Sequence, residues 1–507
     1  MKLTELPDDV LIAVFSCFCF HCQHPEQFPH ADTLGVRNDK KTLALLCRTC
    51  KSLGVVAQPI LYHYYATGNL EKRTKLYEGE DGTEKQSLEP DFMPQFLRTI
   101  TQHPELASHL KTLQFVHHSD GKIPGYSTAF DIVESLIEFS TANDLLSWSN
   151  DWLKTPIYKW SSGKRYYLHQ WLAALVMVCA PQLQSVLLAL ESWVTFWESL
   201  GEGSHVKLPS IEVLGLIGST LDYHFTELKN LYAAAPNLKT IYACDAAGWS
   251  ANAPWSNHNS FEIGNGYDLQ LANLRHLAIS DLIPSNLGSL LPCVAQLEDL
   301  EYYWDRYELV EFSLVELLQP VKKSLRRLCI SFLPHRDENI PNIFDDDGPD
   351  MRWPKWYPVP EIDYPPIDTL SDFDHLEDLQ LDCRSIYRPE DRDRSDRLLR
   401  MLPRTIVRLR IFYLYRGMCQ ALSALASKAQ KDFPHLVEIV VGVSEGTDPQ
   451  YDEEIQQTRE VIGVLEAANI SVGWRTDPFG ADARTMIPGA TAGSRLVALP
   501  RVLDESM

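Results

Sequence analysis

The sequence predicts an α/β protein in which a helical N-terminal module precedes a long array of helix–strand units. Two observations lead to this prediction. A short phrase with the pattern L-x-x-L-x-L recurs along the chain, and the first 65 residues carry more apolar surface than so short a segment can enclose. Helix-compatible sequence precedes several phrases, so one unit is expected to be a helix, a tight turn and a short strand.

Ten phrases follow the pattern when Ile, Val, Ala or an aromatic residue is accepted at an apolar position. They begin at Leu110, Leu183, Ile211, Leu238, Leu274, Leu297, Leu325, Leu376, Ile406 and Leu436. From Leu183 onward, successive starts are mostly 23 to 36 residues apart, with one interval of 51. This spacing brackets the period of leucine-rich repeats, whose neighbouring units bury one another's apolar edges. We therefore predict an irregular leucine-rich-repeat-like α/β solenoid, shaped as an arc or horseshoe.

The pattern divides the chain into four parts. They are a helical module at 1–65, a linker with an N-terminal cap at 66–109, the solenoid at 110–474, and a tail at 475–507 that we predict to be disordered. Three long insertions break the repeat period, at 119–171, 245–270 and 333–373. Segments of this length inside a repeat array are usually functional or disordered.

The N-terminal module is expected to contain three helices. Pro7 fits the first turn of a helix, and the carboxylates of Asp8 and Asp9 suit the positive end of its dipole. The predicted helices run from there to about Phe20, over about Lys41–Leu46, and over about Cys50–Ala57, before Pro59. Apolar residues occupy every face of the first helix, so it should be covered on more than one side.

The module resembles the F-box, particularly in its fungal form. The resemblance rests on Leu6-Pro7-Asp8-Asp9-Val10-Leu11 with Val14-Phe15-Ser16, on Leu45-Leu46-Cys47-Arg48, and on Gln58-Pro59-Ile60-Leu61-Tyr62. Two features depart from that family: about 20 residues separate the first two helices, and Tyr62 stands where a tryptophan is often found. The resemblance implies an adaptor-facing surface made of Leu6, Pro7, Val10, Leu11, Val14, Phe15, Leu43, Leu46 and Cys47.

The same resemblance implies a function. An F-box links a substrate receptor to a Skp-type adaptor, and through it to a cullin-RING ubiquitin ligase. The chain would then be the substrate-recognition subunit of such a ligase, without catalytic activity of its own, and would bind an unidentified target protein. The alternative is a leucine-rich-repeat scaffold unrelated to ubiquitin, in which the N-terminal helices only cap the array.

A target would bind the inner face of the solenoid. The third, fifth and seventh positions of each phrase are expected to point to that face, where charges of both signs mix with aromatic residues. Two tryptophans in the Pro-rich insertion are further candidates. The predicted target-binding residues are Tyr242, His276, Asp299, Glu301, Tyr303, Arg327, Asp378, Asp382, Arg408, Arg410, Phe412, Trp353 and Trp356.

Composition argues against several partners. A net charge of −22 with a pI near 5.1 disfavours nucleic acid and anionic membrane surfaces. The apolar run Val10–Phe20 follows two aspartates and has no cleavage pattern after it, so it does not match a signal peptide. We therefore expect an intracellular protein of the cytoplasm or nucleus, whose 11 cysteines are reduced thiols.

The sequence contains no clear set of residues for catalysis or for metal binding. Gly442-Val-Ser444-Glu-Gly446 matches a nucleophile elbow, but no histidine follows His435 to complete a triad. Zinc ligands are available at Cys17, Cys19, His21, Cys22 and His24, with Cys47 and Cys50 further on. Because Cys17 and Cys19 would lie on different sides of one continuous helix, we expect no metal and no cofactor.

Overall fold

The computed structural model describes most of the chain in segments. They are residues 5–25, 28, 34–67, 75–78, 84–87, 92–115, 130–146, 162–190, 206–218, 225–244, 269–280, 282, 284–304, 313–332, 367–382, 385–386, 395–412, 418–442 and 461–475. These residues form two compact units. Unit 1 holds the described residues up to Cys244 together with 269–273, and unit 2 holds those from Leu274 to Arg475.

Unit 1 begins with a bundle of helices. They are α1 (Asp8–Ser16), α2 (Phe20–Gln23), α3 (Leu34–Thr49) and α4 (Lys51–Leu61). Helices α3 and α4 pack closely at Gly54, where an added Cβ would lie 3.0 Å from the carbonyl oxygen of Cys47. A glycine therefore permits this approach. Lys40 joins the bundle to the following strand, because its ammonium group donates a hydrogen bond to the Tyr64 carbonyl (2.8 Å).

Three boundaries in this bundle differ from the sequence predictions. The first helix stops at Ser16 rather than near Phe20, because the N–H groups of Cys17, Phe18 and Cys19 bond to carbonyls three residues back. The helix predicted over about Lys41–Leu46 begins earlier, at Leu34, and α2 is a short additional helix that was not predicted. Pro59 lies inside α4 instead of ending it, since a proline in the last turn removes a single backbone bond.

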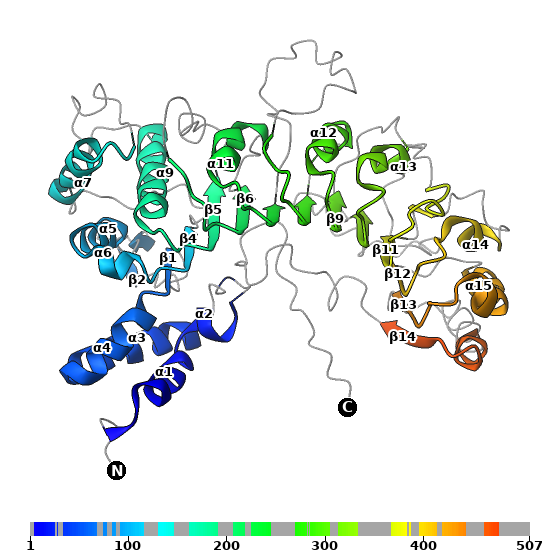
Figure 1. Ribbon diagram of the computed structural model, residues 1–507, viewed down its shortest axis with the longest axis horizontal. Helices are drawn as coiled ribbons and strands as arrows, with labels where there is room; N and C mark the ends of the chain where they lie inside the picture. Colours follow the sequence, from blue (N-terminus) through cyan, green and yellow to red (C-terminus); the bar gives the residue numbers. More distant parts are fainter. Residues whose placement is uncertain are drawn as a thin grey trace, which may run out of the picture. The chain divides into compact units, whose positions relative to one another are not determined.

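The rest of unit 1 combines parallel strands with helices. Its strands are β1 (Tyr64–Thr67), β4 (Thr112–Phe115), β5 (Ser185–Leu190), β6 (Val213–Gly218) and β7 (Thr240–Cys244), hydrogen-bonded in that order. Its helices are α5 (Met93–Gln102), α6 (Pro104–Ala107), α7 (Phe130–Ala142), α9 (Ser162–Cys179), η4 (Phe225–Leu228) and α11 (Lys229–Ala234). Figure 1 shows α9 and α11 on the same side of β5 and β6.

A separate antiparallel ribbon lies between β1 and α5 in the chain. Its strands are β2 (Lys75–Glu78) and β3 (Glu84–Ser87). The predicted linker and cap at 66–109 therefore contain this ribbon and helix α5. Strand β1 starts within the predicted 1–65 module and pairs with β4, so the helical bundle runs directly into the sheet.

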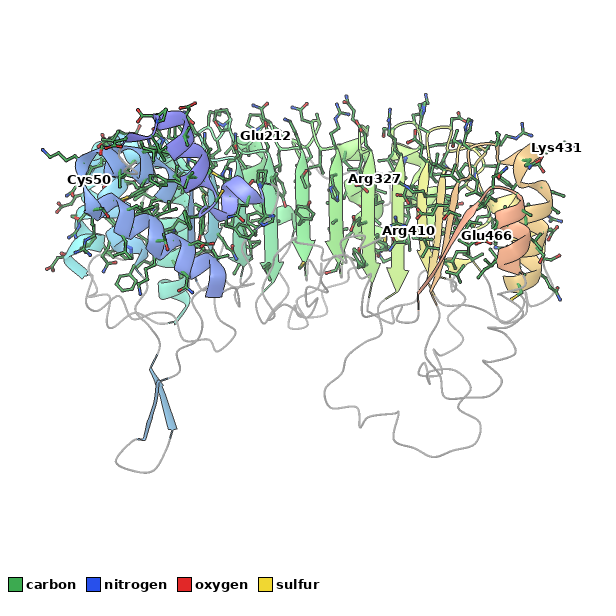
Figure 2. All side chains as sticks on the ribbon, turned by 90° about the horizontal axis from the view of Figure 1, so that it is seen from below. Cys50, Glu212, Arg327, Arg410, Lys431 and Glu466 are labelled. Atoms are coloured by element: carbon green, nitrogen blue, oxygen red, sulfur yellow. The ribbon has the colours of Figure 1, made fainter. Side chains whose placement is uncertain are left out.

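Unit 2 repeats the same architecture. Its strands are β8 (His276–Ser280), β9 (Asp299–Trp304), β10 (Arg327–Phe332), β11 (Asp378–Asp382), β12 (Arg408–Phe412), β13 (Glu438–Gly442) and β14 (Ser471–Arg475). They are parallel neighbours in that order, and Figure 2 shows them side by side. The helices are α12 (Pro284–Leu290), η5 (Leu291–Val294), α13 (Leu314–Leu317), η6 (Gln319–Val321), α14 (Arg397–Met401), α15 (Met418–Asp432) and a final stretch over Val461–Ala467.

One backbone contact recurs from strand to strand. The carbonyl at the second position of a phrase accepts the N–H groups of the second and third positions of the next phrase. In unit 1 the Lys111 oxygen accepts from Gln184 (2.8 Å) and Ser185 (3.0 Å). In unit 2 the Glu298 oxygen accepts from Arg326 (2.8 Å) and Arg327 (2.9 Å). Each strand therefore starts in register with the one before it.

Polar side chains just before the phrases add a second link between neighbouring units. Asn237 donates to the Pro209 carbonyl (2.8 Å), Ser324 to that of Ala295 (2.9 Å) and Thr405 to that of Leu376 (2.8 Å). Inside the sheets, the fourth and sixth positions of the phrases are buried, as the pattern predicted. The structure thus confirms an α/β chain built from parallel strands at the phrases.

Several sequence predictions fall on residues outside the described segments. Of the insertions, α7 and the first half of α9 occupy part of 119–171, whereas 245–268 and 333–366 are not described. The same holds for the tail beyond Arg475 and for residues 443–446 of the Gly-x-Ser-x-Gly motif. Among the helices that the structure does describe, none is long and apolar enough to cross a lipid bilayer.

The buried phrase positions should dominate the stability of unit 2. Leu328, at the fourth position of its phrase, is 1% exposed, so Leu328→Ala should cost about 2–5 kcal/mol of unfolding free energy. Arg326→Ala, on an exposed residue just before the same strand, should change it by less than about 0.5 kcal/mol. Urea unfolding followed by circular dichroism measures both. Equal midpoints for the two variants would contradict this packing.

Candidate functional site

The residues predicted to face an adaptor divide into a buried set and an accessible set. Leu11, Phe15 and Leu43 are 1–2% exposed and lie in one core with Leu53 and Ile60 of α4. These three side chains hold the bundle together, so their prediction as surface residues needs correction. Leu6, Leu46 and Cys47 pack against the edge of the same core and are partly buried.

The accessible set includes residues of α1 that the F-box resemblance also named. Pro7, Val10 and Val14 are exposed, the two valines to 39% and 40%. Val10 and Val14 are four residues apart and therefore neighbours on the helix surface, as are the buried Leu11 and Phe15. Helix α1 thus directs one apolar pair into the core and another out of it.

Three further large apolar side chains are exposed among the described residues of the bundle, and the sequence patterns did not identify them as contact residues. Ile12 of α1, Leu45 of α3 and Val55 of α4 are 50%, 55% and 74% exposed. With Val10 and Val14 they form what we call the exposed aliphatic set. Isolated apolar residues are common on surfaces. Five large ones on three short helices of a single bundle are a feature that needs explanation.

The second candidate region is the strand face of unit 2. Residues at the third position of successive phrases are register partners, and basic and acidic side chains alternate among them. We call this row the charge ladder: His276, Asp299, Arg327, Asp378, Arg408 and Glu438. Opposite charges directly across neighbouring strands stabilise a sheet, whereas like charges there would destabilise it.

The ladder pairs buried carboxylates with partly exposed arginines. Asp299 contacts Arg327 through its Oδ2 atom, and Asp378 Oδ2 lies 3.1 Å from Arg408 Nη2. The two aspartate side chains are 5% and 6% exposed, whereas the two arginines are 47% and 46% exposed. A binding partner would therefore meet the arginines, because the carboxylates are enclosed by their neighbours.

Two other predicted target-binding residues are engaged internally. The Tyr303 hydroxyl donates a hydrogen bond to Glu301 Oε2 (2.9 Å), and both side chains are buried. His276 lies 3.8 Å from both Asp299 Oδ2 and Glu301 Oε1. Asp299, Glu301, Tyr303 and Asp378 are thus parts of the packed strand face rather than open contact residues, which corrects their prediction.

The remaining target-binding candidates vary in how far the structure describes them. Tyr242, His276 and Arg410 are half-buried, and Arg410 Nη2 lies 3.9 Å from Glu438 Oε2. Asp382 and Phe412 belong to β11 and β12, but their side chains are outside the described part. Trp353 and Trp356 lie in a segment that is not described at all.

The donor atoms of His276, Asp299 and Glu301 also lie within 4.8 Å of one another, which is compatible with a metal ion. The ladder explains this cluster without a metal. Arg327 already supplies a positive charge to Asp299, and Tyr303 supplies a hydrogen-bond donor to Glu301. A cation placed there would compete with the guanidinium group, so we assign the cluster to the ladder.

The ladder should show strong coupling between its members. In a double-mutant cycle of Arg408→Met and Asp378→Asn, we expect a coupling energy of about 1–3 kcal/mol, because Asp378 is buried. The same cycle for Lys239→Met and Glu212→Gln, an exposed pair at 2.9 Å, should give less than about 1 kcal/mol. Chemical denaturation measures both cycles. Additive effects at Arg408 and Asp378 would contradict a shared interaction.

Comparison with known proteins gives no family for this chain. No model of a protein family matches its sequence, and no curated protein matches it either. The features of the chain that bear on its function are therefore the accessible residues of the helical bundle and of the strand face.

Proposed function

We propose that the chain is a non-catalytic substrate receptor, which docks on a Skp-type adaptor of a cullin-RING ubiquitin ligase through its helical bundle. The exposed aliphatic set is the observation that carries this proposal. The bundle has a closed core of its own, and still presents Val10, Ile12, Val14, Leu45 and Val55 to solvent. A protein partner that covers such side chains gains about 25 cal/mol per Å² of apolar surface.

The resemblance of the bundle to the F-box supports the choice of partner. The residues that the resemblance names as adaptor-facing have different roles in this proposal. Leu11, Phe15 and Leu43 maintain the fold, and Val10 and Val14, with Pro7 beside them, are available for contact. Ile12, Leu45 and Val55 extend the accessible apolar surface.

We assign target binding to the accessible part of the strand face. Arg327 and Arg408 expose about half of their guanidinium side chains, while their aspartate partners stay enclosed. Guanidinium groups held in place by buried carboxylates are well suited to bind acidic or polar protein surfaces in a fixed orientation. The receptor would promote ubiquitin transfer by proximity, since holding a target near the ligase raises its effective concentration.

A scaffold unrelated to ubiquitin is the competing function. In that case the helical bundle would only cover the first strand of the sheet. A cap needs an apolar contact on one side, which the core around Leu11 and Phe15 already provides. In a scaffold of this kind, the exposed side chains of Val10 and Val14 would have no role. Substitution of these two residues therefore distinguishes the two functions.

Charged substitutions in the exposed aliphatic set should abolish adaptor binding without unfolding the bundle. We expect the Val10→Asp/Val14→Asp double variant to lose co-purification with a co-expressed Skp-type adaptor, with affinity reduced at least about tenfold. Val464→Asp is the matched control, because Val464 is 50% exposed on the last helical stretch of unit 2 and should bind normally.

Circular dichroism and thermal melting of each variant show whether the fold is retained. Phe15→Asp is not a suitable test, because a charge in the bundle core would unfold it and remove binding indirectly. Two results would refute the docking proposal: unmodified protein that does not bind the adaptor, or a folded double variant that binds it as well as the control.

A further inference from the structure

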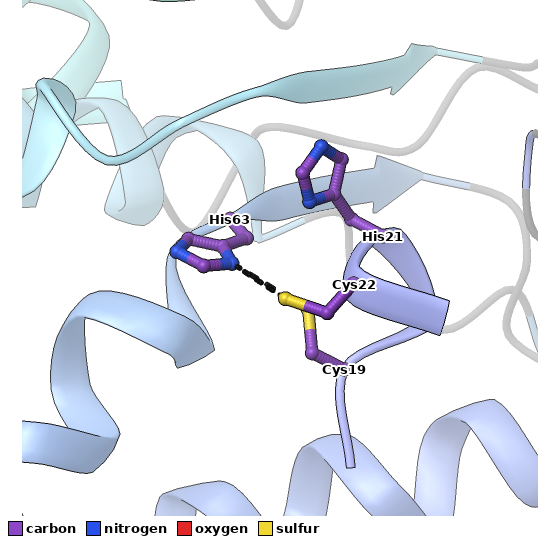
Figure 3. Close-up of side chains that lie close together, drawn as sticks. All are labelled: Cys19, His21, Cys22 and His63. Atoms are coloured by element: carbon purple, nitrogen blue, oxygen red, sulfur yellow. Dashed lines mark hydrogen bonds between the residues drawn. The ribbon is translucent and has the colours of Figure 1, made fainter. Parts of the chain in front are cut away.

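Four potential metal ligands meet at the junction between the helical bundle and the sheet. Cys19 immediately precedes α2 in an extended conformation, and His21 and Cys22 lie within α2. His63 lies between the end of α4 and the start of β1, directly before Tyr64. Figure 3 shows the Cys19 and Cys22 side chains beside the His63 ring, with the His21 ring above them. One short turn therefore supplies three donors, and a distant segment supplies the fourth.

The backbone holds both segments in place. The His63 carbonyl accepts hydrogen bonds from the N–H groups of Lys111 (2.8 Å) and Thr112 (3.0 Å), which start strand β4. The Cys19 N–H bonds to Ser16 (3.1 Å), and the Cys19 carbonyl accepts from Gln23 (3.2 Å). Donor atoms carried by a backbone fixed in this way are preorganised, so binding an ion would require little rearrangement.

The distances between donor atoms suit a tetrahedral ion. One sulfur or nitrogen atom from each residue lies within 4.8 Å of the others. The His63 Nδ1 atom is 3.2 Å from Cys22 Sγ and 3.8 Å from Cys19 Sγ. In a tetrahedral zinc site with ordinary bond lengths, sulfur and nitrogen ligands are about 3.6 Å apart. The observed distances lie on either side of that value.

His21 has an unexplained nitrogen atom in this cluster. Its Nδ1 atom is buried and has no hydrogen-bond partner among the described residues. The ring stands edge-on to that of His63, with centroids 5.5 Å apart. A buried polar atom without a partner costs free energy, and a bound ion is one way to satisfy it. A metal ion bound between the rings and the sulfurs would satisfy it.

The two thiols and the two imidazoles are close enough to shift one another's pKa. The interaction with Cys19, together with the neighbouring His21 and His63, lowers the pKa of Cys22. The interaction with Cys22 and burial raise the pKa of Cys19. Zinc binds the thiolate form of cysteine, so both cysteines would release their protons to a bound ion.

We propose that Cys19, His21, Cys22 and His63 bind one Zn²⁺ ion in a closed tetrahedral site. Two thiolates and two imidazoles are a donor set typical of structural zinc. The four protein donors leave no open coordination position, so the ion cross-links α2 to the junction between α4 and β1. This inference does not depend on the proposed receptor function.

The other cysteines of the bundle provide controls within the same protein. Cys47 and Cys50 share the spacing of Cys19 and Cys22, but Cys50 Sγ instead lies 3.2 Å from the Ser52 hydroxyl. Cys17 is exposed and directs its thiol to the Ala13 carbonyl. None of these three belongs to the cluster.

The test uses the full-length chain, purified under reducing conditions without chelators and analysed by elemental mass spectrometry. We expect one zinc per chain, and loss of that zinc in Cys22→Ser and in His63→Ala. The Cys47→Ser/Cys50→Ser variant should retain it. A strong chelator should lower the melting temperature of the unmodified protein and of the control, because zinc binding contributes to folding stability.

Two measurements on the unmodified protein guard against variants that simply fail to fold. After Co²⁺ replaces zinc, the absorption spectrum should show tetrahedral ligand-field bands with thiolate charge transfer. Peptide mapping should show that the ion protects Cys19 and Cys22, but not Cys17, from alkylation. The inference is overturned if the folded chain contains no zinc and binds none, if Cys19 and Cys22 form a disulfide instead, or if the Cys47/Cys50 variant also loses the ion.

Discussion

The shared backbone carbonyl at the second position of each phrase is the constraint on which the parallel strands of both units depend. Because one oxygen accepts two N–H groups from the next strand, as Glu298 does from Arg326 and Arg327, no strand can slip by a residue without losing both bonds. Such a slip would also turn the buried leucines outward. Register and burial therefore reinforce each other along each unit, and variation in the length of the connecting segments is tolerated.

A fixed register also determines what the strand face can offer. It places Asp299 beside Arg327 and Asp378 beside Arg408, so charges that look independent in the sequence become a single paired row. The buried aspartates hold the arginine side chains in a fixed orientation. The aspartate carboxylates themselves are not accessible at the surface. At the start of β4 the same kind of interaction holds the His63 carbonyl in place. The side chain of His63 lies beside Cys19 and Cys22, so the junction between α4 and β1 is in contact with the segment around α2.

The strands could be predicted from the sequence because their signal is local, with a period of two and a fixed apolar phrase. The role of α1 could not. Val10 with Val14 and Leu11 with Phe15 are equivalent apolar pairs four residues apart, and only the packing of α3 and α4 selects which pair is buried. The cluster that we propose as a metal site could not be recognised in the sequence for a related reason. The helix was expected to continue through Cys19, and His63, 41 residues beyond Cys22, approaches only after folding.

In the proposed receptor, the helical bundle is a folded element whose core and contact surface use different residues. Hydroxyl-radical footprinting of the full-length chain, with and without a Skp-type adaptor, tests this division most directly because it reports the accessibility of individual side chains. Without adaptor, Val10, Val14, Leu45 and Val55 should be modified, while Leu11 and Phe15 stay protected. Adding the adaptor should protect the valines of α1. Reactive Leu11 and Phe15 in the free protein, or valines whose reactivity the adaptor does not change, would contradict the account.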